Sequence, residues 1–483
     1  MTFNSLSYFL FLPIVYLIFH LAADRWRWLI LLISSYVFYA CWQAFYLVAA
    51  LLMVTGVSYA CGLRIASERD ESPAKRWLWI GSGACLAALA LLKYLPFFES
   101  HANSSFGLNL SFSSAIIGIG VSYFTFQAIS YLADIYLEVR DPEPHFGYYA
   151  LYLAFFPKLL QGPIERAGDL LPQLKQPYRF DPDTMRSGML LFACGLFKKV
   201  VVADRLARYA DQVYNNTDAY SGLAFLIATY AYALQIYLDF AAYTDMARGT
   251  GQMFGIKLAR NFDSPYFATS IADFWRRWHI SFSRFLQDYI FQPLQMGWRN
   301  WGAWGTAAAL IVTFLVSGIW HGASWGFLVW GLLHGIYLAA SIWYRPYQKR
   351  LHKLLGLQKS RWLKWWQVFA TFHLVSFAWI FFRATDLREA WYVISSIFDW
   401  QSYLAVKEIG LHRYIARNIT VGLGFVDFIV LTALLLSLLL LQKVRPDQVL
   451  NQPAYFRWTS YSVIFVAILF LQMPSSKFLY FKF

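Results

Sequence analysis

The sequence predicts an all-α polytopic membrane protein, and composition, aromatic content and a series of apolar runs lead to this prediction. Of the 483 residues, 59% are hydrophobic and only 14% are charged, whereas soluble domains carry roughly 25% charged residues. Aromatic residues make up 20% of the chain, with 21 Trp and 32 Tyr. Trp and Tyr are favoured where a helix meets the membrane surface. A soluble fold of this length has too little interior for so much apolar side chain, so we expect many membrane crossings.

The apolar runs give the candidate crossings in chain order. Spanning a bilayer takes about 20 residues of helix, and fewer inside a bundle, so we expect about 11–12 transmembrane helices. The candidate crossings are 6–22, 28–41, 44–63, 77–95, 115–137, 186–203, 222–243, 304–320, 325–343, 365–382, 426–441 and 461–473.

Basic residues between these runs predict the orientation. The net charge of +14 does not indicate nucleic-acid binding, because Lys and Arg occupy short links rather than one polar face. The links 64–76 and 345–364 are basic and fall on the cytoplasmic side if the N-terminus is outside. The link 96–114 has no Lys or Arg and then falls outside. We therefore expect a multi-pass protein with an extracytoplasmic N-terminus and a retained first helix.

Two segments do not fit the spanning pattern. Residues 147–180 contain three prolines, and residues 262–300 mix aromatic residues with several charged ones. Neither is tolerated in contact with lipid, because unpaired backbone and charges are costly there. We expect re-entrant or interfacial helices that cover a cavity. No internal repeat or long linker is evident, so residues 1–483 are interpreted as one domain.

His321 is the first candidate for chemistry. It lies in SGIWHGASWGF, where two apolar runs meet among small residues. Small residues allow close helix approach or leave room for a ligand, and an ionisable ring at membrane depth suggests function. A neutral imidazole is able to take a proton from a hydroxyl group. From the residues alone, this role and a simple hydrogen bond to a neighbouring helix are equally good interpretations.

A second set of candidates comes from two polar stretches. His279 lies in DFWRRWHISFSRFLQDY, where helical spacing predicts one aromatic face and places Arg276 and Arg277 as cation sites for lipid phosphate or an anionic donor. An interfacial anchor helix is the simpler alternative. Asp239 and Asp245, in YLDFAAYTDMARG, end an apolar run and are expected to orient a base or to brace arginines. No nucleophile elbow, Walker loop or clustered metal-ligand set is present, and no metal is expected.

Several motifs in order resemble the membrane-bound O-acyltransferase (MBOAT) family. The resemblance is to its bacterial branch with alginate O-acetyltransferase and the D-alanyl transfer protein of teichoic-acid modification. These motifs are GVSYFTFQAISYLADIY (120–136), FFPKLLQGPIERAGDLLPQL (155–174), YLDFAAYTDMARGTGQMFGIKLARNFDSPY (237–266), DFWRRWHISFSRFLQDYIFQPL (273–294), SGIWHGASWGFLVWGLLHG (317–335), AWIFFRATDLREAW (378–391) and the terminal FLYFKF.

The resemblance implies a helical ring around a central tunnel and an acyl-transfer site. The WHGASW histidine of the family is His321 here, implied as the general base, and the RRWHIS histidine is His279, implied to position the donor thioester. The expected donor- or tunnel-binding residues are Trp320, Asp239, Asp245, Asn261, Arg276 and Arg277. The chain departs from the family after Tyr289, where Phe-Gln-Pro-Leu-Gln-Met-Gly replaces the usual Tyr-Ile-Pro-Leu-Gly-Gly, and at Gln287, which replaces a common Arg.

The resemblance therefore predicts an O-acetyltransferase of the bacterial inner membrane that serves exopolysaccharide acetylation. No bound cofactor is expected, and acetyl-CoA is the expected donor, with an acyl carrier protein as the alternative. An extracytoplasmic partner protein is expected to accept the acetyl group and pass it to the polysaccharide. The competing classes are a transporter or flippase without covalent chemistry, D-alanyl transfer from a carrier protein, and a non-catalytic scaffold. A transporter often has inverted repeats, and none is evident.

Overall fold

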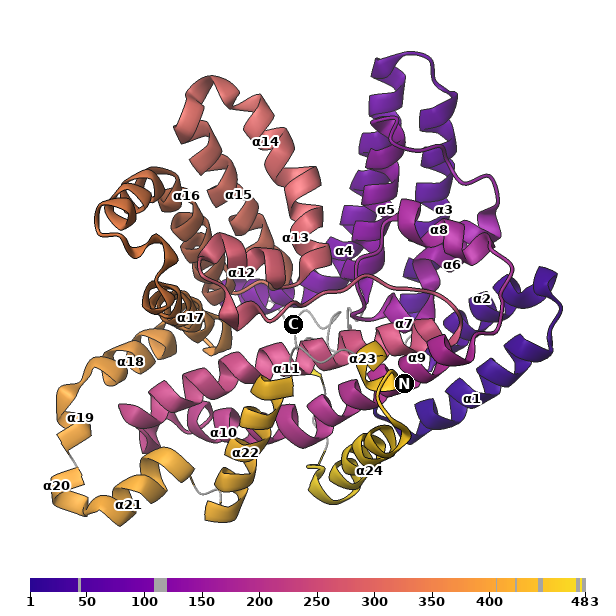
Figure 1. The fold of residues 1–483 in the computed structure, drawn as a ribbon. Helices are drawn as coiled ribbons and strands as arrows, with labels where there is room; N and C mark the ends of the chain where they lie inside the picture. Colours follow the sequence, from indigo (N-terminus) through magenta and orange to yellow (C-terminus); the bar gives the residue numbers. More distant parts are fainter. Residues whose placement is uncertain are drawn as a thin grey trace. The chain divides into compact units, whose positions relative to one another are not determined.

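Every regular element in the described part of the chain is a helix (Figure 1). In this computed structural model the described residues are 1–41, 45–107, 120–404, 406–421, 424–441, 446–474 and 478–479. Two compact units are present, one of residues 1–196 with 243–260 and one of residues 197–242 with 261–483. The boundary falls within the long helix α11 (Leu223–Met253), which contributes its first two thirds to the second unit.

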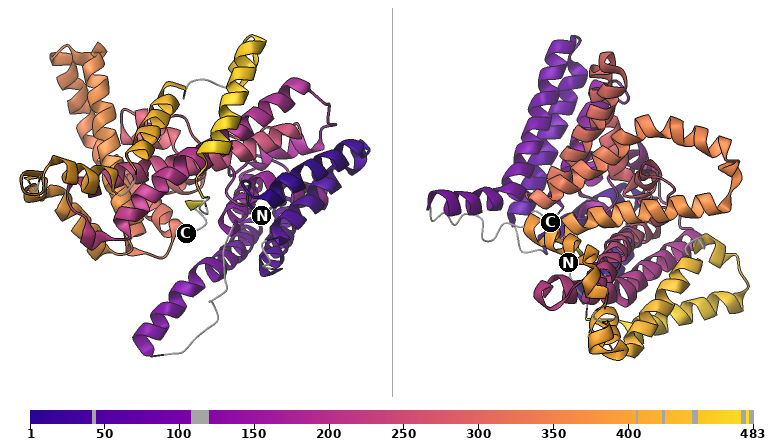
Figure 2. Two further views of the ribbon diagram at one scale, coloured as in Figure 1. Left: turned by 90° about the horizontal axis from the view of Figure 1, so that it is seen from below. Right: turned by 90° about the vertical axis from the view of Figure 1, so that its left-hand side faces the viewer.

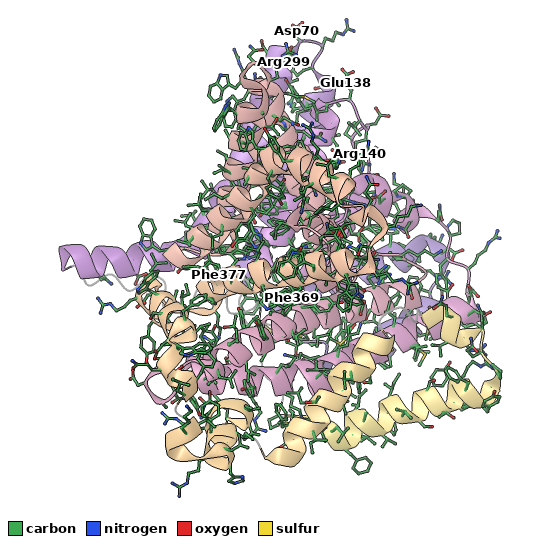
Figure 3. The ribbon with its side chains drawn as sticks, turned by 60° about the vertical axis from the view of Figure 1, so that its left-hand side comes forward. Asp70, Glu138, Arg140, Arg299, Phe369 and Phe377 are labelled. Carbon is green, nitrogen blue, oxygen red and sulfur yellow. The ribbon has the colours of Figure 1, made fainter. Side chains whose placement is uncertain are left out.

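The first unit contains the N-terminal helices and a set of short helices. Its elements are α1 (Leu6–Leu21), α2 (Asp24–Ala40), α3 (Phe45–Ser67), α4 (Glu71–Phe106), α5 (Val121–Tyr136), α6 (Phe146–Ala154), α7 (Phe156–Leu159), α8 (Ala167–Lys175) and α9 (Pro182–Phe197). Helices α3, α4 and α5 pack side by side (Figure 1). Their shared end is polar, with Asp70 and Glu138 at that end in Figure 3, and the Tyr136 hydroxyl donates to Glu71 at 3.1 Å.

The second unit contains the remaining helices. They are η1 (Lys198–Ala203), α10 (Asp204–Tyr214), η2 (Thr217–Ala219), most of α11, η3 (Pro265–Phe267), α12 (Ile271–Arg277), α13 (Ile280–Leu286), η4 (Gln287–Phe291), α14 (Gln292–Gly297), η5 (Arg299–Trp301), α15 (Gly302–His321), α16 (Trp325–Leu354), η6 (Leu357–Lys359), α17 (Arg361–Arg383), α18 (Leu387–Phe398), α19 (Trp400–Leu404), α20 (Val406–Ile409), α21 (Leu411–Ile415), η7 (Ala416–Thr420), α22 (Phe425–Leu441), α23 (Pro446–Leu450) and α24 (Ala454–Leu471).

Seven helices among the described residues are long and apolar enough to cross a membrane, and two shorter apolar helices accompany them. The seven are Phe45–Ser67, Glu71–Tyr94, Leu223–Met253, Arg299–His321, Trp325–Leu354, Arg361–Arg383 and Ala454–Leu471. They confirm the all-α polytopic prediction. The larger number of about 11–12 crossings stays a prediction, since short helices inside a bundle are also able to span.

The two segments predicted not to span consist of short helices. Within 147–180 the longest helix has 9 residues, and within 262–300 no helix exceeds 7. One expectation for the second segment is wrong. Its aromatic and basic residues do not form one continuous helix, because α12 ends at Arg277 and α13 begins at Ile280, with His279 between them.

Helices α15 and α16 form a tightly packed hairpin that ends beside His321. A Cβ on Gly331 would lie 2.3 Å from the Phe314 carbonyl oxygen, and one on Gly318 would lie 2.4 Å from the Phe327 carbonyl oxygen. Glycine at these positions therefore permits the close backbone approach. Ahead of it, α13 to α14 lead to a turn near Arg299, labelled in Figure 3, from which α15 returns.

Helices α16 and α17 form a second hairpin with a basic closed end. Both views in Figure 2 show this hairpin, and Phe369 and Phe377 mark α17 in Figure 3. The link 345–364, predicted to be cytoplasmic, forms its closed end. The hairpins α15–α16 and α16–α17 thus share α16, and their other ends bring His321 and Phe382 together, with ring centroids 5.0 Å apart.

Candidate active site

His321 is the last residue of α15, in a largely aromatic environment. Its ring centroid lies 4.6 Å from Trp320 and 4.9 Å from Trp330, whose ring is perpendicular to it. Its side chain is buried, while Gly322 to Ser324 after it are partly exposed. The helix end therefore places an imidazole in an apolar surrounding next to a short, partly accessible turn.

His279 occupies the break between α12 and α13. Its backbone has a φ of 41°, in the left-handed region that non-glycine residues rarely adopt. Such strain persists only where the surrounding structure holds it, and it is common at functional sites. The imidazole is buried against Phe240, with ring centroids 4.7 Å apart. Burial lowers the pKa of His279 to about 3, so the ring is neutral at cytoplasmic pH.

The two histidines lie around one stacked pair of rings. Phe282 and Trp320 stack with centroids 4.3 Å apart and an interplanar angle of 27°. The His279 centroid lies 5.0 Å from Phe282 and 6.2 Å from Trp320. The His321 centroid lies 6.2 Å from Phe282 and 4.6 Å from Trp320. The structure therefore brings together His279, Trp320 and His321, which are distant in sequence or on different helices.

Asn261 holds the backbone directly after His279. Its Oδ1 accepts hydrogen bonds from the Ser281 N–H at 3.2 Å and from the Ser281 hydroxyl at 2.7 Å. Its carbonyl oxygen accepts from the Ile280 N–H at 2.9 Å. These three bonds fix the start of α13, whose first N–H groups have no partner within the helix. Asn261, predicted to line the donor path, thus positions His279.

Asp239 belongs to a buried charge cluster. Its Oδ1 accepts from Lys199 Nζ at 2.7 Å, and its Oδ2 accepts from the Leu479 N–H at 2.7 Å. Lys199 also pairs with Asp204 at 2.8 Å. The carboxylate braces a lysine and not an arginine, and it follows directly before Phe240, which contacts His279. Sequence gave no signal for Lys199, since its partner lies forty positions away.

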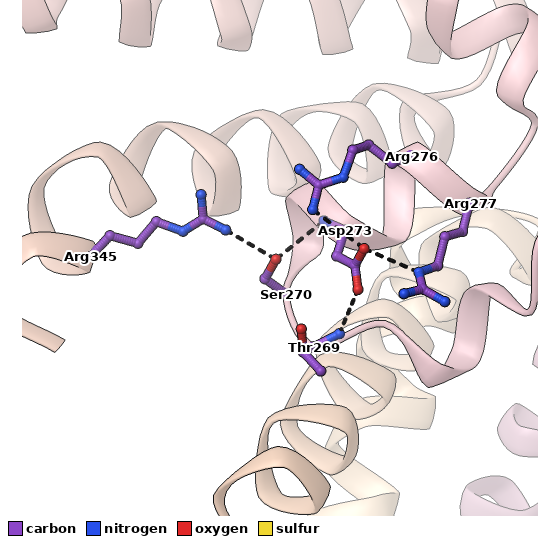
Figure 4. A network of polar contacts seen from close by, with 6 residues as sticks. All are labelled: Thr269, Ser270, Asp273, Arg276, Arg277 and Arg345. Atoms are coloured by element: carbon purple, nitrogen blue, oxygen red, sulfur yellow. Dashed lines mark hydrogen bonds and ion pairs between the residues drawn. The ribbon is translucent and has the colours of Figure 1, made fainter. Parts of the chain in front are cut away.

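Arg276 and Arg277 converge on one carboxylate at the end of α12 (Figure 4). Asp273 accepts from Arg276 Nη2 at 3.3 Å and from Arg277 Nε at 3.1 Å. Burial alone would raise the pKa of Asp273, but the bonds from Arg277, the Thr269 N–H and Arg276 outweigh it, and the pKa is lowered. The carboxylate is therefore ionised at neutral pH.

A third arginine joins this network. Arg345 Nη2 donates to the Ser270 hydroxyl at 3.0 Å, and Ser270 caps α12 by accepting from the Asp273 N–H (Figure 4). Three guanidinium groups thus accompany one carboxylate. The signal for Arg345 was its place at the start of the basic link 345–364.

Asp245 does not join the second unit. It lies in the first unit, where it pairs with Arg248 at 3.5 Å. The apolar run was predicted to end near residue 243, but α11 continues to Met253. Six residues along a helix turn the side chain by about 240°, so Asp239 and Asp245 point in different directions.

The first unit holds a buried pair that sequence reasoning missed. Lys158 is fully buried, donates to the Gln127 side-chain oxygen and lies over the Tyr152 ring, 5.2 Å from its centroid. Glu165 accepts from the Ala259 N–H at 2.6 Å. Burial lowers the pKa of Lys158 and raises the pKa of Glu165. The pair connects three segments distant in sequence.

Two further side chains near His321 were undervalued from sequence. Trp330 lies one turn before His334 on α16, with ring centroids 5.1 Å apart. Both are fully buried. The available signal was their spacing of four residues in the same motif as His321. Among the described residues, no group of three or more His, Cys, Asp or Glu side chains is placed to hold a metal ion.

The chain is similar to known proteins over most of its length. Residues 122–384 match the profile of the family described as MBOAT, membrane-bound O-acyltransferase family. A probable alginate O-acetylase AlgI of Pseudomonas putida is 37% identical over 82% of this chain and 81% of its own length. A peptidoglycan O-acetyltransferase of Helicobacter pylori is 35% identical over 77% of this chain and 73% of its length. A teichoic acid D-alanyltransferase of Bacillus subtilis is 27% identical over 55% and 68%.

Proposed function

The chain belongs to the membrane-bound O-acyltransferase family, a family of acyl-transferring enzymes, and from this premise we propose that it moves an acetyl group from a thioester to a hydroxyl group of an extracytoplasmic polysaccharide. Its relatives named for alginate and for peptidoglycan acetylation are 37% and 35% identical to it. Such close values do not favour one polymer, so the proposal names the hydroxyl class. The teichoic-acid relative is more distant at 27%, which favours acetyl over D-alanyl transfer.

One observation carries the proposal: His279 and His321 share the stacked Phe282–Trp320 pair. Acyl transfer needs a base for the attacking hydroxyl and a group that positions or polarises the thioester carbonyl. His321 takes the role of base, because it lies beside the partly exposed turn after α15. His279 is neutral and held rigidly by Asn261, so it positions the donor.

The proton balance of this step closes within the site. The hydroxyl oxygen attacks the thioester carbon while its proton moves to His321. The tetrahedral intermediate collapses, the carbon–sulfur bond breaks, and the proton passes from His321 to the leaving thiolate. An ester and a free thiol result, and no metal or redox cofactor takes part.

The arginine network supports a donor that enters from the cytoplasmic side. Arg345 begins the basic link predicted to be cytoplasmic, and it shares the network with Arg276 and Arg277. Guanidinium groups bind phosphate well, and acetyl-CoA carries phosphate groups. Acetyl-CoA is therefore the proposed donor, and an acyl carrier protein with a phosphate-linked arm is the alternative.

The proposed setting follows from the same orientation. The protein lies in the bacterial inner membrane with its N-terminus outside, in contact with membrane lipid, and its two units act as one catalytic domain. An extracytoplasmic partner protein accepts the acetyl group at the outer side and passes it to the polysaccharide.

The proposal is tested with His321→Ala and the matched control His373→Ala. His373 lies on α17 and bonds the Tyr230 hydroxyl at 2.8 Å, away from the stacked pair. Each variant replaces the wild-type copy in the cell that encodes the protein, so that its partners are present. Membranes then receive acetyl-CoA labelled in the acetyl group, and label in polysaccharide is measured.

We expect His321→Ala to lose transfer with normal amounts of folded protein, and His373→Ala to keep it. Normal transfer by His321→Ala refutes the assignment of the base. A transporter or scaffold would show no label in any ester formed by the wild-type protein. Transfer from a charged carrier protein but not from acetyl-CoA would identify the alternative donor.

A further inference from the structure

Four buried polar atoms on the helices that meet at His321 have no hydrogen-bond partner in the described part of the chain. They are Ser317 Oγ on α15, Trp330 Nε1 and His334 Nε2 on α16, and Ser376 Oγ on α17. Buried polar groups are nearly always hydrogen-bonded, and leaving one unmet costs about 1–3 kcal/mol. Their grouping on three packed helices therefore indicates a ligand with acceptor atoms.

Other hydroxyl groups on the same helices are satisfied within the helix. Thr313 on α15 donates to the Ala309 carbonyl at 2.6 Å, and Thr371 on α17 donates to the Gln367 carbonyl at 2.7 Å. Such back-bonding to the preceding turn is open to any serine or threonine in a helix. The unmet atoms are thus a local feature of the region around His321.

His334 is held as a hydrogen-bond donor. Trp275 Nε1 lies 3.2 Å from His334 Nδ1. An indole nitrogen only donates, so Nδ1 must accept and the ring proton sits on Nε2. A second proton on Nδ1 would break this bond in a fully buried position. His334 therefore presents a fixed Nε2–H and does not serve as a base.

Trp330 connects this donor to His321. Its ring lies 5.1 Å from the His334 ring and 4.9 Å from the His321 ring. Trp330 and His334 are one helical turn apart, on the same face of α16. Two unmet N–H donors thus lie on successive turns beside the proposed base.

We propose that Trp330 Nε1–H and His334 Nε2–H bind the carbonyl oxygen of the acyl group and stabilise its negative charge when the hydroxyl attacks. This assignment rests on the proposed function. As the carbon–oxygen bond to the acceptor forms, the carbonyl electron pair moves to oxygen and is met by the two donors. When the pair returns, the thiolate leaves with the proton held by His321. Fixed donors in an apolar site are effective because they need no reorganisation.

Three variants separate a hydrogen bond to the reacting oxygen from a packing role. His334→Gln keeps an acceptor for Trp275 and an N–H donor, whereas His334→Leu fills a similar volume without either. Trp330→Phe keeps an aromatic ring and removes the N–H. The matched control is His373→Leu on α17, which removes a histidine outside this group. Each protein is assayed for acetyl transfer from labelled acetyl-CoA, with kcat, KM and the pH profile recorded.

Loss of one such donor typically lowers kcat by roughly 100- to 1000-fold. We expect a loss of this size for His334→Leu with KM for acetyl-CoA unchanged, at least about tenfold for Trp330→Phe, and a retained rate within about tenfold for His334→Gln. The midpoint of the pH profile should stay in place, because the base is untouched. If His334→Leu fails to fold, Trp330→Phe and His334→Gln carry the test.

Two outcomes overturn the inference. One is a kcat for Trp330→Phe and His334→Leu within threefold of wild type with a lowered Tm, which would mean that the donors hold an ordered water. The other is an equal loss in His334→Gln and His334→Leu, which would mean packing alone. Either result with an inactive His321→Ala leaves the proposed function standing. An active His321→Ala would refute the base instead.

Discussion

Removing the charge of Lys199 should destabilise the second unit strongly, because this cation neutralises two buried carboxylates. Lys199 is fully buried and pairs with Asp239 at 2.7 Å and Asp204 at 2.8 Å. In Lys199→Met the methionine replaces the aliphatic stem, but both carboxylates lose their counter-charge. Breaking a buried pair costs about 3–5 kcal/mol. At about 2 °C per kcal/mol for a large domain, the apparent Tm should fall by roughly 6–10 °C.

The assay is thermal unfolding of the purified protein in detergent, followed by the fraction that remains monodisperse. Asp239→Asn keeps the Lys199–Asp204 pair and an oxygen for the Leu479 N–H, so its loss should be smaller, about 1–3 kcal/mol. The triple variant Lys199→Met, Asp204→Asn, Asp239→Asn removes every charge. Replacing a whole buried ion set is often near neutral, so it should recover most of the lost Tm. A Lys199→Met protein as stable as wild type, or a triple variant below the single one, would refute the reasoning.

Three more predictions address the site. His279 has a folded-state pKa of about 3 against about 6.5 unfolded, so its neutral form stabilises the fold above pH 6.5 and that stability is lost as the pH falls. At pH 5 this loss is about 2 kcal/mol, and His279→Gln should show a smaller drop in Tm between pH 7.5 and 5. Gly331→Ala places a Cβ 2.3 Å from the Phe314 carbonyl oxygen and should separate α15 from α16, lowering Tm and transfer; Gly83→Ala, with nothing within 4 Å, should do neither. Arg345→Ala should raise KM for acetyl-CoA about 5- to 10-fold with kcat unchanged, and an unaltered KM would remove this residue from the donor site.

The sequence predicts the helices well because hydropathy depends on local residues alone. The runs 325–343 and 365–382 lie inside α16 and α17. Helix ends are missed, since a helix continues beyond its apolar part whenever the protein satisfies its polar residues. Thus α4, predicted from residue 77, begins at Glu71. The left-handed backbone at His279 was not predictable either, because it is imposed by Asn261 and the burial of the ring rather than by local preference.

The candidate site divides along the same line. Motifs identify His321 and His279, but they do not show that the two histidines share one pair of stacked rings, which depends on the packing of α13 against α15. Lys199 has no signal at all, since both of its acids are recognised only in space. Asp245 illustrates the opposite error: closeness in sequence to Asp239 suggested a common role, yet helical geometry turns it away.

The burial of the three histidines in the second unit argues for one division of labour. His279 is 1% exposed and His334 is fully buried, while His321 is 4% exposed and is followed by three partly exposed residues. A base has to meet a hydroxyl that arrives from outside, so access favours His321. His334 has its Nδ1 occupied by Trp275, and His279 is kept neutral by burial. Two rings that resist protonation suit positioning and donation, whereas the ring at the accessible helix end suits proton transfer. The same aromatic walls that exclude water from all three therefore impose different chemistry on each.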